Sequence, residues 1–247
     1  MIEESSTAAE RRVGTAGWTL PRAVRARFDD DGTQLERYAR RFSCVEINSS
    51  FYRAHLSATY ARWARSVPDG FRFALKLPKE ITHIRRLVDI DAPLLRFLDE
   101  SSALGVKRDV LLVQLPPSFA YDQAVVEPFL ALLRARYSGR VACEPRHETW
   151  FQPAADAVLN AFRIARVAAD PSPIGTPTTP GGSDAWQYWR FHGSPRTYYS
   201  SYDAARTEAI ARALRASRSP AWCIFDNTAL GAATANALAV LDLLGTD

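Results

Sequence analysis

Charged and amide side chains stand at the ends of short apolar runs along this chain, and such side chains can carry acid–base or anion-binding chemistry. The residues at these ends are Glu46 and Asn48, Lys76, Gln114, Glu144 with Arg146 and His147, Asp170, Arg190 with His192, and Asp226 with Asn227. Side chains alternate along a strand, so residues two apart point to the same face. Because an unpaired buried charge is costly, we expect these side chains to face a site at the strand ends.

Two glutamates are the candidates for general acid–base catalysis. Glu144 is followed two residues later by Arg146, whose charge should hold the pKa of Glu144 down and keep it a proton acceptor. Glu46 has no cation in its own strand, so burial should raise its pKa and make it the acid. We assign His192 as the proton shuttle and place Asp226 in the same catalytic group.

Cations and aromatic rings near the same ends are candidates for substrate binding. Arg146 and Arg190 are expected to form a bidentate clamp for sulfate, phosphate or a carboxylate. Aromatic rings that follow strand ends would offer stacking surfaces for a sugar or a base. The predicted substrate-binding residues are Trp18, Asn48, Tyr52, Lys76, His83, Gln114, Arg146, His147, Trp150, Asp170, Arg190 and Asn227.

Two other chemistries use the same residue types. The histidines and carboxylates are ligand types for zinc or manganese, but no H-x-H or H-E-x-x-H spacing occurs and the neighbouring cations oppose a metal charge. We therefore assign no metal ligands and keep a divalent metal as an alternative cofactor. A Schiff base at Lys76 is disfavoured because neighbouring carboxylates would keep the amine protonated. No glycine-rich phosphate loop is present, so we expect no tightly bound organic cofactor.

The elements that position these residues alternate between strand and helix. Polar strand ends recur about eight times with helical stretches in most gaps, which predicts a single TIM-type (β/α)8 barrel with its site at the strand C-termini. Strands are expected at 13–16, 44–48, 71–77, 110–115, 140–144, 166–170, 186–191 and 222–226, and helices at 33–42, 57–67, 91–105, 123–137, 154–163, 204–216 and 232–244. Residues 171–183 are rich in proline, glycine and threonine, so we expect no regular helix after the sixth strand.

Composition limits the class of protein. Residues 1–12 are polar and predict a flexible tail, and residues 13–247 predict one barrel domain. Three isolated cysteines, Cys44, Cys143 and Cys223, favour a reduced cytoplasmic protein. No apolar stretch approaches the ~20 residues needed to span a bilayer. The net charge is +4, but the arginines are scattered, so nucleic acid is not the favoured partner and a small anionic molecule is.

The same residues carry a resemblance to a known family. The segments are Gly14–Trp18 (GTAGW), Val45–Asn48 (VEIN) with Phe51 and Tyr52, Phe73–Lys76 (FALK) with Thr82 and His83, Gln114–Pro117 (QLPP), Glu144–His147 (EPRH) with Trp150, Arg190–Gly193 (RFHG), Phe225–Asn227 (FDN), and Asn236 with Ala237. In this order they resemble the domain of unknown function 72 family of YecE-like barrels. The resemblance implies a TIM-type barrel with a site at the strand C-termini and no established reaction. Relatives commonly have serine at position 16 and often asparagine at position 226, so Ala16 and Asp226 depart from the pattern.

These observations predict an enzyme, a hydrolase, lyase or isomerase, that acts on a small anionic or sugar-like substrate by carboxylate and histidine acid–base chemistry. A metal-dependent phosphoesterase or nuclease is the alternative enzyme. A non-catalytic binder of an anionic metabolite or of nucleic acid is the alternative from another class. Neither the substrate nor the oligomeric state is indicated by the sequence.

Overall fold

The computed structural model describes residues 9–245. Its strands determine where the other elements lie. In chain order they are β1 (Arg11–Thr15), β2 (Cys44–Ile47), β3 (Arg72–Lys76), β4 (Arg108–Gln114), β5 (Arg140–Glu144), β6 (Ile164–Arg166), β7 (Ala168–Asp170), β8 (Gly181–Gly182), β9 (Gln187–Phe191) and β10 (Ala221–Phe225). Each strand expected from the sequence is present, although the sixth is divided into β6 and β7.

The strands form two sheets in which almost all neighbours are parallel. One sheet has the order β1-β10-β9-β7, and the other has the order β2-β3-β4-β5-β6-β8. Only the two-residue strand β8 runs antiparallel to its neighbour among the described strands, pairing with β6. Parallel strands buried on both faces account for the nearly continuous apolar runs in the sequence. The fold is therefore mixed α/β with parallel sheets.

The two sheets meet at two places. Ala16 and Glu46 form a parallel bridge directly after β1, and the Gly17 amide donates to the Glu46 carbonyl at 2.8 Å. On the other side, β6 pairs with β5 in one sheet while β7, separated from it by a single residue, pairs with β9 in the other. A continuous stretch of chain thus belongs to both sheets.

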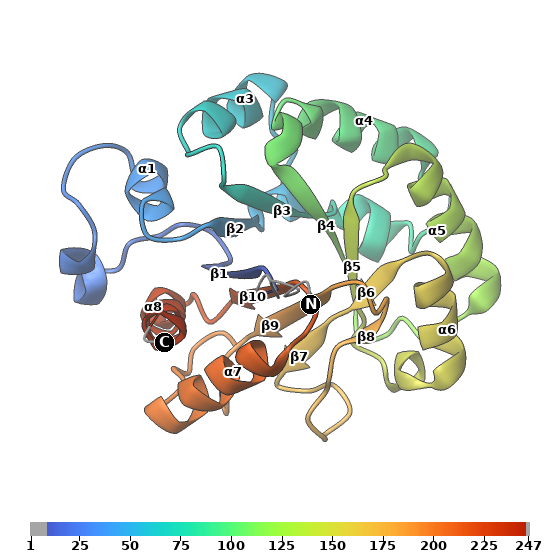
Figure 1. Cartoon of the computed structure of the whole chain (residues 1–247). Helices are drawn as coiled ribbons and strands as arrows, with labels where there is room; N and C mark the ends of the chain where they lie inside the picture. Colours follow the sequence, from blue (N-terminus) through green and yellow to red (C-terminus); the bar gives the residue numbers. More distant parts are fainter. Residues whose placement is uncertain (1–8, 246–247) are drawn as a thin grey trace, which may run out of the picture.

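The helices lie around the strands (Figure 1). They are α1 (Gln34–Ala39), α2 (Ser49–Tyr52), α3 (Ser57–Arg65), α4 (Asp91–Ser102), α5 (Gln123–Arg136), α6 (Pro153–Ala161), α7 (Ala204–Ala216) and α8 (Ala232–Leu244), with short 3-10 turns η1 (Arg22–Arg27), η3 (Gly105–Lys107) and η4 (Glu148–Phe151) and a π-helical turn η2 (Glu80–Ile84). In Figure 1, α3 to α6 follow one another around the six-stranded sheet, and α7 and α8 lie beside the four-stranded sheet. No helix occurs in residues 171–186, as expected from their composition.

Buried apolar residues form two separate clusters because strand side chains alternate between two faces. The larger cluster joins one face of the strands to the helices, for example Val45 and Phe73 with Phe97 and Leu238. The smaller one, here called the inner cluster, comes from the opposite face and consists of Cys44, Ala74, Val110, Leu112, Ala142, Ala165, Val167, Trp186, Tyr188, Trp222 and Ile224. The polar residues at the strand ends continue this second face.

The N-terminal segment is more ordered than the sequence suggested. Residues 1–8 of the expected 1–12 tail lie outside the described residues. Strand β1 already begins at Arg11, where Arg11 and Arg12 pair with Ala221 and Trp222 of β10. Backbone pairing therefore starts two residues earlier than we expected. No helix within residues 9–245 has both the length and the apolar character needed to cross a membrane.

Tyr38 ties α1 to the junction of β1 and β2. Its hydroxyl accepts from the Thr15 amide at 2.9 Å and donates to the Cys44 carbonyl at 3.0 Å, and the side chain is fully buried. The two strands are in close contact here, since a Cβ on Gly14 would lie 2.4 Å from the Cys44 carbonyl oxygen. Helix α1 is fixed locally by a capping box between Thr33 and Glu36.

We expect Tyr38→Phe to lower the free energy of unfolding by about 1–3 kcal/mol, because it leaves a buried amide and a buried carbonyl without their partner. Urea denaturation measures the change. The matched control is Tyr199→Phe, whose ring is 40% exposed and should cost less than about 0.5 kcal/mol. Equal effects of the two substitutions would contradict the role given to Tyr38.

Candidate functional site

The candidate site lies directly above the inner cluster, at the C-terminal ends of the strands. Strand β9 supplies Tyr188 and Arg190 on one face, and His192 follows on the same face. The same alternation places Glu46 and Asn48 at the end of β2, Glu144 and Arg146 at the end of β5, and Asp226 after β10. Tyr188 belongs to the apolar inner cluster, so the polar groups begin one layer above it.

Arg190 occupies the centre of this site and contacts three carboxylates from three other strands. Its Nε and one terminal nitrogen donate to the two oxygens of Glu46 at 3.0 and 2.6 Å. Its other terminal nitrogen donates to Glu144 at 2.5 Å, and a third carboxylate, Asp226, accepts at 3.0 Å. The side chains of Arg190, Glu46 and Glu144 are 1%, 0% and 0% exposed. The guanidinium therefore has no nitrogen left without a carboxylate partner.

His192 bridges two of the same carboxylates. Its Nδ1 lies 3.1 Å from Asp226 Oδ2, and its Nε2 lies 2.8 Å from Glu144 Oε1. Arg146 stands beside this contact, with one terminal nitrogen 2.6 Å from Glu144 and 2.8 Å from His192 Nε2. A ring held by both nitrogens has a fixed orientation, and it can pass a proton between the two carboxylates.

The side of the site that is open to solvent is formed by a different set of groups. Asp226 and Arg146 retain 9% and 16% side-chain exposure, whereas Glu144 and His192 retain none. Asn48 donates to Asp226 at 3.2 Å, which leaves its buried Oδ1 without a hydrogen-bond partner. The buried Nε of Arg146 also has no partner. One acceptor and one donor next to the solvent-facing groups are thus without a hydrogen-bond partner in the described part of the chain.

Opposite charges keep two of the buried carboxylates, Glu144 and Asp226, ionised. Burial would raise the pKa of Glu144, but the charges of Arg146, Arg190 and His192 overcome this and hold that pKa well below its usual range. Burial likewise opposes ionisation of Asp226, and Arg190 together with the hydrogen bond from His192 lowers its pKa. The direction expected for Glu144 from its neighbour Arg146 is confirmed, with Arg190 as a second cause.

The buried network is the group of side chains joined by these contacts, namely Arg190, Glu46, Glu144, Asp226, His192 and Arg146. Two expectations about this network need correction. Arg190 does not form an anion clamp with Arg146, because its guanidinium is buried and fully engaged by carboxylates. Glu46 does have a cation partner, which comes from β9 and not from its own strand. Tyr188 also donates to Glu46 at 2.8 Å, so the carboxylate of Glu46 is enclosed. Glu46 has no exposed surface with which to contact a substrate directly.

Several predicted substrate-binding residues are used elsewhere in the structure. His147 caps the turn η4 by accepting from the Thr149 amide, and Trp150 is buried with its indole nitrogen on the Phe119 carbonyl. Asp170 pairs with Arg206. Asn227 is buried and donates to the Ser200 carbonyl and to Asn236. Tyr52 is 78% exposed and lines a separate hollow with Lys79 and Glu80. The structure does not bring these five residues to the network.

The remaining predicted residues lie at its edge. Trp18 is half-buried, packs against Trp63 and lines a hollow together with Asn48. Gln114 ends β4 and donates to the Leu115 carbonyl at 2.7 Å. His83 packs edge-to-face on Phe51. The amine of Lys76 lies over the same Phe51 ring, 4.1 Å from its centroid.

Two residues at the site were not among the predicted site residues. Tyr188 lies two positions before Arg190, so the alternation of strand β9 was a signal for it. Tyr198 packs edge-to-face on His192 at 5.7 Å and stays 45% exposed, so it partly covers the network. Its backbone has a positive φ of 69°, and its amide donates to the His192 carbonyl. Tyr198 is one of the aromatic residues that follow a strand end, which was the signal for a ring near the site, although no spacing in the sequence indicated the turn.

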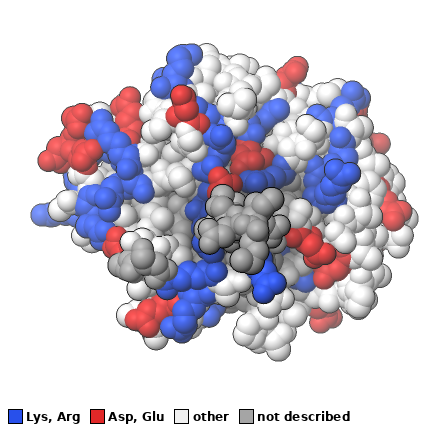
Figure 2. Space-filling view, in the orientation of Figure 1, with Lys and Arg blue, Asp and Glu red and all other residues white. Residues whose placement is uncertain are grey.

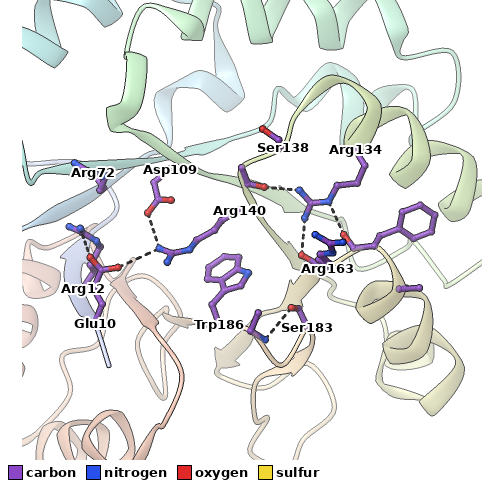
Figure 3. Close-up of a pocket in the computed structure, with 14 residues that line it drawn as sticks. Glu10, Arg12, Arg72, Asp109, Arg134, Ser138, Arg140, Arg163, Ser183 and Trp186 are labelled. Carbon is purple, nitrogen blue, oxygen red and sulfur yellow. Dashed lines mark hydrogen bonds and ion pairs between the residues drawn. The ribbon is translucent and has the colours of Figure 1, made fainter. Parts of the chain in front are cut away.

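A larger hollow lies at the opposite ends of the strands, with a volume of about 860 Å³ (Figure 3). Its lining includes five arginines, Arg12, Arg72, Arg134, Arg140 and Arg163. Most of these cations already have partners: Arg134 donates to the carbonyls of Phe162 and Gly139, and Arg140 pairs with Asp109. They close the strand starts, so this hollow is a weaker candidate for chemistry than the buried network.

Metal binding and thiol chemistry depend on how the histidine, carboxylate and cysteine side chains are grouped. Within residues 9–245 no three histidine, cysteine, aspartate or glutamate side chains are grouped so as to hold a metal ion. The three cysteines are buried, and burial raises the pKa of each thiol.

On the face shown in Figure 2, basic side chains occur in separate groups, several of them beside acidic ones, and not in one stripe.

Glu144→Gln tests the electrostatic balance of the network. The folded-state pKa of Glu144 is lowered, so its ionised form stabilises the fold above pH 4.5 and loses this effect as the pH falls towards the folded-state pKa. We expect the variant to be less stable than the wild type by on the order of 3–5 kcal/mol at neutral pH. The difference should narrow as the pH falls below 4.5, as measured by urea denaturation at several pH values.

The matched control is Glu148→Gln, four residues further on, where the side chain is exposed and has no ion pair within residues 9–245. It should change stability by less than about 0.5 kcal/mol. A difference between the wild type and Glu144→Gln that stays constant with pH would show that Glu144 is not held ionised by its neighbours.

Comparisons with known proteins show which family the chain resembles. The family model described as a protein of unknown function, DUF72, matches residues 12–247. The YecE protein of Escherichia coli K12 is 30% identical over 168 residues, 66% of this chain and 60% of the relative. The YunF protein of Bacillus subtilis is 26% identical over 57% of this chain and 52% of its own length. The chain thus matches less than two thirds of the length of these relatives.

Two solved structures share the fold. A DUF72 family protein from Enterococcus faecalis has a TM-score of 0.79 at 20% identity, covering 96% of both chains. A DUF72 family protein from Thermotoga maritima has a TM-score of 0.77 at 22% identity, covering 95% of this chain and 99% of its own. The match of the family model over almost the whole chain shows that this protein belongs to the DUF72 family.

Proposed function

We propose that this protein is an enzyme that moves protons on a small anionic substrate, as a lyase, isomerase or hydrolase does, at the C-terminal ends of its strands. The observation that carries this proposal is the position of His192, whose two nitrogens lie 3.1 and 2.8 Å from Asp226 and Glu144. A purely structural ion pair needs no imidazole between two carboxylates. A proton path from a solvent-facing carboxylate to a buried one needs a group between them that can both accept and donate a proton, and an imidazole can do this.

We also propose that the two sheets together form a closed (β/α)8 barrel. The Ala16–Glu46 bridge and the shared stretch of β6 and β7 are the two junctions such a ring requires. In that architecture the inner cluster fills the barrel and the buried network is its top layer, where barrel enzymes place their catalytic groups.

The roles follow from exposure. Asp226 is the most exposed of the three carboxylates and is ionised, so it is the group that accepts a proton from a bound substrate. His192 passes the proton to Glu144, which lies behind it. Glu46 and Tyr188 hold Arg190 in place and do not contact the substrate.

We assign substrate binding to the side chains near solvent that have a hydrogen-bonding atom without a partner or a charge without an ion pair in the described part of the chain. Arg146 offers its unpartnered Nε to an anionic group, and Asn48 offers its unpartnered Oδ1 to a hydroxyl. Lys76 adds a positive charge from β3. This replaces the clamp of two arginines by one arginine and one lysine, and it favours a small anion over a nucleic-acid backbone.

Sulfate binding tests this assignment, because sulfate keeps its charge across the relevant pH range. We expect millimolar sulfate to raise the melting temperature, since a ligand that binds only the folded state stabilises it. The pKa of Lys76 is lowered to about 8, so the affinity should fall as the pH rises through that value and the amine loses its charge. Arg146→Gln should abolish the shift in melting temperature.

Lys76→Arg is the matched control because it keeps a positive charge at all these pH values. The dependence of sulfate affinity on pH near 8 should disappear in this variant. A melting temperature of the wild type that does not respond to sulfate would overturn the binding assignment.

Exchange of carbon-bound hydrogen with solvent deuterium tests the catalytic assignment without knowledge of the product. Small keto acids and sugar phosphates are incubated with the protein in D2O and followed by proton NMR. The wild type should exchange at least one of them, and Asp226→Asn and Glu144→Gln should each be slower by about 10²–10⁴-fold, because each removes one end of the proton path. Glu148→Gln should exchange like the wild type.

Binding of sulfate with no exchange in the wild type, or equal exchange in all variants, would favour a binding protein over an enzyme. Circular dichroism of each variant establishes that the fold is retained.

A further inference from the structure

Lys76 is the one charged side chain at the site that has no ionic partner within residues 9–245. It ends β3 with 9% of the residue exposed, and its amine lies over the Phe51 ring, 4.1 Å from the centroid. No hydrogen bond to the amine is present in the described part of the chain. An amine that faces an aromatic ring and a small opening to solvent is arranged as a nucleophile and not as a structural counter-ion.

The reason for this isolation is the arginine at the centre of the site. From the sequence, carboxylate neighbours were expected to keep Lys76 protonated. The carboxylates are indeed in the same site, but Glu46, Glu144 and Asp226 all accept hydrogen bonds from Arg190 instead. The positive charge of Arg190 also acts directly against a charge on Lys76.

Every charged group that faces Lys76 acts within this balance. Burial, together with Arg190, lowers the pKa of Lys76 to about 8, although Glu144, Glu46 and Asp226 pull it upward. His83 on η2 packs on the same Phe51 ring, and burial together with the charge of Lys76 lowers the pKa of His83 to about 4. His83 is therefore a neutral imidazole near a partly neutral amine.

The other two lysines of the chain have different surroundings. Lys79 is exposed, and the amine of Lys107 donates to the carbonyls of Ala64 and Val67 at 2.8 and 2.7 Å. With only three lysines in the sequence, these two are internal references for the reactivity of an ordinary amine and of a hydrogen-bonded amine.

We propose that Lys76 is a catalytic amine that forms an imine with a small aldehyde or ketone carrying an anionic group. This deepens the proposed function and rests on it, because Arg146 is the group that binds the anionic end. The substrate class is thereby narrowed to anionic carbonyl compounds, and the reaction class to lyase or isomerase chemistry.

The step balances without any added oxidant or reductant. The lone pair of the neutral amine forms a bond to the carbonyl carbon while the C=O π bond breaks, and one proton moves from the nitrogen to the oxygen to give a carbinolamine. The nitrogen lone pair then forms the C=N bond as the C–O bond breaks, and the second N–H proton replaces the proton that the departing hydroxyl takes up, so that amine and carbonyl yield imine and water. His83 can carry these protons. The imine withdraws electrons from the adjacent carbon, whose proton passes to Asp226.

Reductive trapping tests the proposal on the full chain. The protein is incubated at neutral pH with glyoxylate, an aldehyde with a carboxylate, in the presence of cyanoborohydride, and the adducts are located by peptide mass spectrometry. Lys76 should be modified at least about tenfold faster than Lys79, because an amine with a pKa near 8 has a far larger neutral fraction than an ordinary lysine amine. Lys107 should remain unmodified.

Two variants separate the imine from anion binding. Lys76→Arg keeps the charge and should leave the modification of Lys79 unchanged, which controls for general reactivity. Arg146→Gln should slow the modification of Lys76 by glyoxylate but not by acetaldehyde, which has no anionic group.

Modification of Lys79 as fast as that of Lys76 would overturn the proposal, even if sulfate still binds at Arg146. Conversely, rapid modification of Lys76 that is indifferent to Arg146→Gln would keep the nucleophilic amine and overturn the anionic substrate. The failure of the imine and the failure of the anion site therefore give different results.

Discussion

The fold depends at its centre on one arginine that joins residues of four strands. Arg190 extends from β9 to carboxylates on β2, on β5 and after β10, so its contacts cross from one sheet to the other. A single buried guanidinium can do this because it is planar and carries donors on three nitrogens. Removing it would leave Glu46 without its ion-pair partner, and Glu144 and Asp226 without one of their counter-charges, in a buried layer. The same contact therefore serves both to join the two sheets and to set the charge state of the candidate site.

Burying such a network costs desolvation free energy, because each charged group loses its contact with water. We infer that the network has a functional role in addition to any contribution to stability. Apolar side chains of similar volume can replace buried ion pairs without loss of stability in other proteins. The inner cluster directly below shows that this chain can fill the space between its strands with apolar side chains such as Leu112 and Trp222. The change from apolar to charged side chains occurs within one residue pair of each strand, at the end where the loops open. This is the position at which we propose the site.

The sequence was enough to predict that polar side chains meet at the strand ends, but not how they pair. Alternation along each strand was enough to place Glu46, Glu144, Arg190 and His192 on one face. It could not show that Glu46 is bound by Arg190, because this contact depends on how strands distant in sequence lie against each other. It also could not distinguish a polar residue at the site from one that satisfies a backbone group. His147 caps a turn and Asn227 binds a carbonyl, although both follow strand ends in the same way as the site residues do.

The isolation of Lys76 follows from the same geometry and gives it functional meaning. In a site with three carboxylates, a lysine would ordinarily take one of them as its partner and remain charged. Here the arginine engages all three first, so the lysine is left over an aromatic ring with a lowered pKa of about 8. Burial, with the charge of Arg190 as a second cause, lowers the pKa of Lys76, while Arg146, Arg190 and His192 keep Glu144 ionised. The proposed proton acceptor Asp226 and the proposed amine nucleophile can coexist in one site because Asp226 takes Arg190 and His192, and not Lys76, as its ionic partners.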